Sequence, residues 1–112
     1  MAGYRDLTVW QKSIDLVVMV YTYTQAFPAN EQYGLTSQMR RAAVSIPSNI
    51  AEGSRRRGKD TAHFLKISFG SASELETQLE ISKRLNFGKT SERDLCESLL
   101  SEILRMLNKM TT

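Results

Sequence analysis

Apolar residues recur three and four positions apart along most of this chain, and that spacing limits the folds open to it. Between residues 7 and 24 the repeat places Leu7, Trp10, Ile14, Val17 and Tyr21 on one side of a helix. Three later stretches repeat the pattern. No stretch alternates apolar and polar residues between turn signals, as a half-buried strand does. The sequence therefore predicts an all-α fold.

The interruptions of the repeat set the expected ends of the first two helices. A cap on Asp6 or Thr8 is expected to start the first helix, and Phe27-Pro28 to end it, because proline disfavours the α conformation in the preceding residue. The second helix is expected to begin within residues 34–37 and to run to about residue 54. Pro47 lies inside it and lacks a backbone N–H, so the helix either kinks there or breaks and restarts. Continued apolar spacing favours the kink.

The third and fourth helices complete the expected bundle. The third spans about residues 60–85 and stops at Asn86-Phe87-Gly88, with Gly88 suited to the left-handed position. The fourth is expected to open at Thr90 or Ser91. Long helices joined by short connections predict antiparallel neighbours. Residues 1–112 are therefore expected to form one domain, an antiparallel up-down-up-down four-helix bundle.

Composition fits a globular, cytoplasmic protein. The apolar fraction of 41% allows a core, and no apolar run approaches the roughly 20 residues that a membrane span needs. The polar start of the chain shows no secretory signal. Cys96 is the only cysteine, so it cannot form an internal disulfide. These features predict the cytoplasm and no membrane association.

Basic residues gather in the middle of the chain although the net charge is only +3. Guanidinium groups suit phosphates because their planar fork donates two parallel hydrogen bonds. No aromatic residues are interleaved with these arginines, so base stacking is not expected. The alternatives are a solvated surface or pairing of the first two arginines with Glu74 or Glu76. The candidate nucleic-acid-binding residues are Arg40, Arg41, Arg55, Arg56, Arg57 and Lys59.

Catalytic, metal and cofactor sites are not expected. His63 and Cys96 are the only residues of their types, and the starts of the third and fourth helices lie at opposite ends of an antiparallel bundle. A di-metal carboxylate site needs Glu-x-x-His pairs on two helices, whereas Asp60 precedes the single histidine here. Gly53 and Gly58 flank arginines without a phosphate-loop pattern. We therefore expect a protein without enzymatic activity.

Several segments together resemble a known family. They are Tyr4-Arg5-Asp6-Leu7, Val9-Trp10-Gln11-Lys12, Tyr33-Gly34-Leu35-Thr36-Ser37-Gln38, Arg40-Arg41-Ala42, Glu74-Leu75-Glu76-Thr77-Gln78 and the specific run Ser45-Ile46-Pro47-Ser48-Asn49-Ile50-Ala51-Glu52-Gly53. The chain resembles, nearly end to end, the four helix bundle proteins encoded in intervening sequences of bacterial 23S ribosomal RNA genes. Within this signature, Asn49 and Glu52 are expected to specify structure, paired with Arg41 or Gln78.

The resemblance implies a bundle that assembles into a homopentamer, with relatives that lack a defined biochemical activity. A similar bundle is the accessory protein of diversity-generating retroelements, a basic pentameric barrel that works with a reverse transcriptase and nucleic acid. The expected function is a self-assembling module whose basic surface binds RNA or a nucleic-acid-handling protein. A protein-interaction adaptor with an acidic partner, and no contact with nucleic acid, remains the alternative.

Overall fold

The computed structural model of the chain describes residues 3–56 and 58–112. For residue 59 it describes the backbone but not the side chain. Four long helices dominate the described residues, which contain no strand, so the predicted all-α four-helix bundle is confirmed. In chain order the elements are a short 3₁₀ helix η1 (Tyr4–Asp6), α1 (Thr8–Thr24), a second 3₁₀ helix η2 (Ala29–Glu31), α2 (Leu35–Arg55), α3 (Lys59–Arg84) and α4 (Thr90–Thr111).

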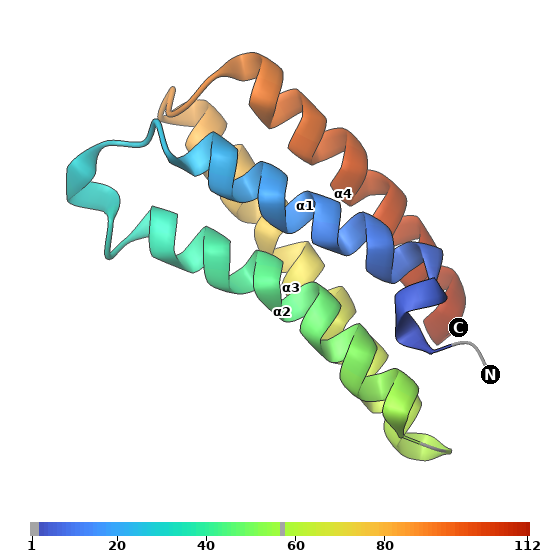
Figure 1. Cartoon of the computed structure of the whole chain (residues 1–112). Helices are drawn as coiled ribbons and strands as arrows, with labels where there is room; N and C mark the ends of the chain where they lie inside the picture. Colours follow the sequence, from blue (N-terminus) through green and yellow to red (C-terminus); the bar gives the residue numbers. More distant parts are fainter. Residues whose placement is uncertain (1–2, 57) are drawn as a thin grey trace.

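The four helices form an elongated antiparallel bundle (Figure 1). Its principal extents are 43 × 23 × 22 Å, and α1 packs against α2 and α4 while α3 packs against the same two helices. The two termini and the turn between α2 and α3 lie at one end, and the α1–α2 and α3–α4 connections lie at the other (Figure 1). We call these the terminal end and the connection end.

Helix α2 passes through Pro47 without a break. The alternative in which the helix stops and restarts there is therefore wrong. Pro47 is buried, and it lies beside Trp10 and Ile14 of α1. The continuous apolar row on both sides of the proline holds the helix together, because each turn gains burial against the neighbouring helices.

The helix starts differ from the predicted caps. Leu7 precedes α1 and Lys89 precedes α4, and neither helix has a side-chain cap. The expected cap at Asp6 or Thr8 is therefore wrong, whereas α4 begins at Thr90, as predicted. At α2 the carboxylate of Glu31 accepts the Leu35 N–H at 3.0 Å. This cap is supplied from the preceding 3₁₀ helix, so short capping-box spacing cannot reveal it.

Helix α3 ends in a Schellman motif centred on Asn86. The Phe87 N–H donates to the Ser82 carbonyl at 3.0 Å, the Asn86 N–H donates to the Lys83 carbonyl at 3.1 Å, and Asn86 has φ of 58°. The left-handed position directly after the helix is thus Asn86, not Gly88 as predicted. Gly88 also has a positive φ, 75°, and a Cβ there would lie 2.5 Å from Cε1 of Tyr23.

The buried core runs the length of the bundle and includes a few polar groups with partners. The Ser68 hydroxyl on α3 donates to the Ile46 carbonyl on α2 at 2.9 Å. A side chain this short reaches a neighbouring backbone only where two helices approach closely. The largest buried apolar residues are Tyr23, Leu16, Met39, Ile46, Ile50, Leu75, Leu79, Leu100, Ile103 and Leu107.

The polar pair in the central signature bonds within α2. The Asn49 amide donates to the carbonyl and hydroxyl oxygens of Ser45 at 2.8 and 2.9 Å, and Glu52 pairs with Arg56. These bonds do not reach Arg41 or Gln78, the partners that the sequence predicted for Asn49 and Glu52. The Ser45 hydroxyl that accepts from Asn49 also lies 2.8 Å from the Ser71 hydroxyl on α3. Asn49 is therefore linked to the α2–α3 contact through Ser45.

Candidate nucleic-acid and partner surfaces

The structure separates the predicted basic residues into two clusters on α2. Arg40 and Arg41 lie toward the connection end, whereas Arg55 and Arg56 lie at the terminal end. Fifteen residues of helix separate Arg40 from Arg55, which corresponds to about 22 Å. Arg57 lies outside the described residues, and so does the side chain of Lys59, which opens α3. The described arginines therefore form two separate patches.

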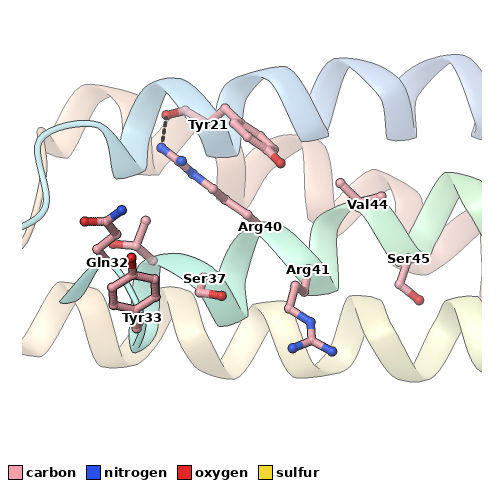
Figure 2. Close-up of a pocket in the computed structure, with 9 residues that line it drawn as sticks. Tyr21, Gln32, Tyr33, Ser37, Arg40, Arg41, Val44 and Ser45 are labelled. Carbon is pink, nitrogen blue, oxygen red and sulfur yellow. Dashed lines mark hydrogen bonds between the residues drawn. The ribbon is translucent and has the colours of Figure 1, made fainter.

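Arg40 is held against α1 by several contacts. Its Nε donates to the Thr24 hydroxyl at 2.9 Å, its Nη2 reaches the Tyr21 carbonyl at 3.5 Å, and its guanidinium lies 4.5 Å from the Tyr21 ring centroid. Figure 2 shows Arg40 turned toward Tyr21, whereas Arg41 points away from α1. Arg41 is exposed. Arg40 therefore joins two helices, and Arg41 is available to a partner.

The predicted pairing of these arginines with acids on α3 is not found. Among the described residues, the ion pairs are Lys12–Glu102, Arg56–Glu52, Arg84–Glu80 and Arg93–Glu97. None includes Arg40 or Arg41. Glu74 and Glu76 are exposed on α3 and likewise belong to none of these pairs.

At the terminal end, two arginines surround an aromatic pair. Arg55 donates to the Tyr4 hydroxyl at 3.3 Å, and its guanidinium lies 5.1 Å from the Tyr4 ring centroid. Arg5 lies 5.6 Å from the same ring and 6.0 Å from that of Trp10. Tyr4 and Trp10 pack edge to face at 5.2 Å. The sequence reading missed Arg5 and found no aromatic beside the arginines, because 51 residues separate Tyr4 from Arg55 along the chain.

Arg56 differs from Arg55 because an acid neutralises it. It pairs with Glu52 one turn earlier at 2.8 Å, and this bond raises the pKa of Arg56. Its guanidinium also lies 5.3 Å from the Phe64 ring centroid. At the terminal end, Arg5 and Arg55 are thus the arginines for which the described residues supply no carboxylate.

Two adjoining hollows lie over α1 and α2, one toward each end of the bundle. Near the terminal end, a hollow of about 280 Å³ is lined by Tyr4, Trp10, Ile14, Val17, Val44, Pro47, Ser48 and Ala51. Near the connection end, a hollow of about 620 Å³ is lined by Tyr21, Gln32, Tyr33, Thr36, Ser37, Arg40, Arg41, Val44 and Ser45 (Figure 2). Val44 lines both hollows, so they form one surface, the α1–α2 groove. Tyr33 at its connection end is 90% exposed.

A second surface follows the outer side of α3. Ile67, Glu74 and Ile81 succeed one another at intervals of seven residues, and Leu85 comes four residues later, so all four lie along one line of the helix. All four are exposed. We call this line the α3 stripe. Beside it lie Glu76 and the Glu80–Arg84 pair, which is 2.9 Å apart.

The two residues considered for nucleophilic chemistry lie far apart. His63 is exposed and packs edge to face on Phe64, whereas Cys96 is buried. Leu79 of α3 lines the same hollow as Glu97, the residue after Cys96, so Cys96 lies near the level of Leu79. On α3, Leu79 is 16 residues, or about 24 Å, from His63. Burial, with smaller contributions from Glu92 and Glu97, raises the pKa of the Cys96 thiol to about 12.

Within residues 3–56 and 58–112, no three His, Cys, Asp or Glu residues converge as a metal site would require. No helix in the same ranges is sufficiently long and apolar to span a membrane.

Comparison with known proteins identifies the family. One solved structure is similar over 94% of this chain and 99% of its own, with a TM-score of 0.82 and 22% identity: a protein of unknown function from the S23 ribosomal protein family of Bacteroides thetaiotaomicron. At this identity the likeness shows the fold. No curated protein matches the chain. The family model described as 23S rRNA-intervening sequence protein matches residues 5–109, so the chain belongs to the 23S rRNA-intervening sequence protein family.

Proposed function

We propose that this protein is a non-enzymatic scaffold that assembles as a homopentamer in the cytoplasm and binds RNA, alone or in a nucleoprotein, through its terminal end. The observation that carries the proposal is the arrangement of Arg5 and Arg55 around Tyr4. Two cations with no described carboxylate partner can contact successive phosphates. The Tyr4 ring, which both guanidiniums contact, holds the two cations side by side.

Assembly strengthens this binding by repetition. Each chain carries a net charge of +3, so five copies carry about +15 in total. Arg55 and Arg5 would recur once per subunit around the ring. A structured RNA that touches several subunits gains affinity from each contact, because later contacts are intramolecular.

Membership of the 23S rRNA-intervening sequence protein family supports an RNA-related role, because this family is named for segments within ribosomal RNA genes. The chemistry of the described residues supports a role without catalysis. The Cys96 thiol is buried with a raised pKa, and about 24 Å of helix separates its level from that of His63. A protein of this kind acts through its surfaces.

Salt-dependent RNA binding tests the proposal. A structured RNA should bind with an affinity that falls steeply between 50 and 200 mM salt, because contacts to phosphates release counterions. Arg55→Glu should weaken binding and reduce the salt slope by about 1. Lys89→Glu makes the same change in net charge at the connection end and is the matched control. Affinity that is independent of salt, or equally reduced by both variants, would refute the assigned surface.

An acidic protein partner is the second candidate. The α1–α2 groove favours it, because the middle of the groove is apolar and Arg40 and Arg41 line its connection end. A partner captured by the protein after nuclease treatment, and lost at high salt, would support this candidate. Capture abolished by nuclease would support RNA.

A further inference from the structure

We infer that the α1–α2 groove is a subunit interface that receives the α3 stripe of a second copy of this chain. The contact is head to tail: the groove of each subunit holds the stripe of the next. This inference rests on the proposed self-assembly and adds the two surfaces that make it. The α1–α2 groove and the α3 stripe are distinct surfaces on different helices, so each copy can make both contacts at once.

The groove has the composition of an interface core. Ile14 and Tyr21 of α1 and Val44 of α2 line its hollows, and each leaves more than a third of its surface exposed. Aromatic residues and arginine, enriched in protein interfaces, border this apolar patch. Contiguous apolar surface rimmed by polar groups marks a protein contact.

Charge and length identify the occupant. The groove has Arg40 and Arg41 at its connection end, so a fitting surface combines apolar side chains with an acid. The α3 stripe supplies Ile67, Ile81 and Leu85 with Glu74 among them. The stripe spans 18 residues, about 27 Å, and the groove follows residues 37–51 of α2, about 21 Å. Ile14, Val17 and Pro47 in the middle of the groove offer phosphates no donors but can pack against the apolar side chains of the stripe, so a second copy fits better than RNA.

The placement of the two surfaces also favours a closed ring. Ile67 and Glu74 lie four residues before and three residues after Ser71, whose hydroxyl meets that of Ser45 on α2. The stripe therefore runs beside the α2-facing side of α3, and α2 separates the stripe from the groove. Neighbouring faces of a four-helix bundle are inclined to each other, so repeated head-to-tail contacts turn the assembly and favour closure into a ring. Opposite faces would instead extend a filament.

Single charges placed on each surface test the inference by light scattering. Val44→Glu disrupts the groove and Ile81→Glu disrupts the stripe, and each variant alone should have the monomer mass of 12.7 kDa. Mixed in equal amounts, they should form a dimer of twice that mass, because each variant keeps one intact surface. Leu95→Glu places the same charge at an exposed position on α4 and should leave the oligomer unchanged.

The outcomes separate this inference from the proposed assembly. A wild-type protein that is monomeric at micromolar concentration overturns both. A wild-type oligomer that survives Val44→Glu and Ile81→Glu overturns the interface and leaves self-assembly standing. Loss of the oligomer in Val44→Glu alone, with no dimer in the mixture, means that groove meets groove and overturns the head-to-tail contact. If Val44→Glu lowers the melting temperature by more than a few degrees, Ile14→Glu tests the same groove from α1.

Discussion

The hydroxyl group of Tyr23 links three segments of the bundle, and its removal should lower stability measurably. The ring is fully buried on α1, and its oxygen lies 2.7 Å from the Ser82 hydroxyl on α3 and 3.0 Å from the Phe87 carbonyl. Because a carbonyl can only accept, Tyr23 donates to Phe87, and the single Ser82 proton goes either to the Tyr23 oxygen or to the Leu79 carbonyl. Tyr23→Phe keeps the ring and removes both hydrogen bonds.

The expected loss follows from what remains unpaired. A hydrogen bond contributes about 1 kcal/mol net, and a buried acceptor left without a donor costs about 1–3 kcal/mol. Ser82 can still donate to the Leu79 carbonyl, 2.8 Å away, so the main loss is at Phe87. We expect Tyr23→Phe to reduce the free energy of unfolding by about 2 kcal/mol. For a domain of this size that lowers the melting temperature by about 8 °C.

Thermal unfolding followed by circular dichroism measures this loss. All variants are compared at one protein concentration, because assembly makes the melting temperature concentration-dependent. Tyr33→Phe removes the same atom from a side chain that is 90% exposed and should stay within about 0.5 kcal/mol of wild type. Ser82→Ala keeps the bond from Tyr23 to Phe87 and should cost less than Tyr23→Phe. If Tyr23→Phe and Tyr33→Phe have the same melting temperature, the reasoning about the buried acceptor is wrong.

Two further predictions concern the glycine beside this ring and the buried thiol. Gly88→Ala should destabilise the protein by about 1–3 kcal/mol in the same assay, because φ is 75° and the new Cβ would lie 2.5 Å from Tyr23. Gly70→Ala, with open space around its Cβ, should be neutral or stabilising. Cys96 should resist iodoacetamide at pH 8 until the protein unfolds, and rapid labelling of the native protein would contradict its raised pKa of about 12. Because the unfolded thiol releases its proton near pH 9, stability should fall as pH rises from about 9 toward 12, and less so in Cys96→Ala.

The helices could be predicted from the sequence, but their exact ends could not. Apolar spacing is a local property, and it placed α2 and α3 within a residue or two of their observed bounds. A helix cap depends on the path of the chain before the helix. Glu31, which caps α2, belongs to a separate 3₁₀ helix. Asn86 takes the left-handed position after α3, although Gly88 is the usual residue type for it, because the hydrogen bonds to Ser82 and Lys83 fix the register.

The sequence identified the arginines, whereas their individual roles depend on tertiary contacts. Arg40 meets Thr24 and Tyr21 across the α1–α2 contact, and Arg55 meets Tyr4 from the other end of the sequence. Among the contacts of the predicted basic residues described above, only the Arg56–Glu52 pair could be predicted from the sequence, because its members are four residues apart. A linear pattern thus reports how much charge a segment carries, but not which charges the fold already uses.

Sorting the arginines by these contacts explains why two functions can share one small bundle. Arg56 is already paired with the carboxylate of Glu52, and Arg40 joins α2 to α1 through a hydroxyl and a ring, so both are engaged within the subunit. Arg41 borders an apolar groove, where a complementary acid gains from exclusion of water. Arg55 stands with Arg5 at the exposed end of the bundle, where a flexible phosphate backbone can approach without displacing a subunit. Reversal of Arg41 should therefore affect assembly first, and reversal of Arg55 should affect RNA binding first.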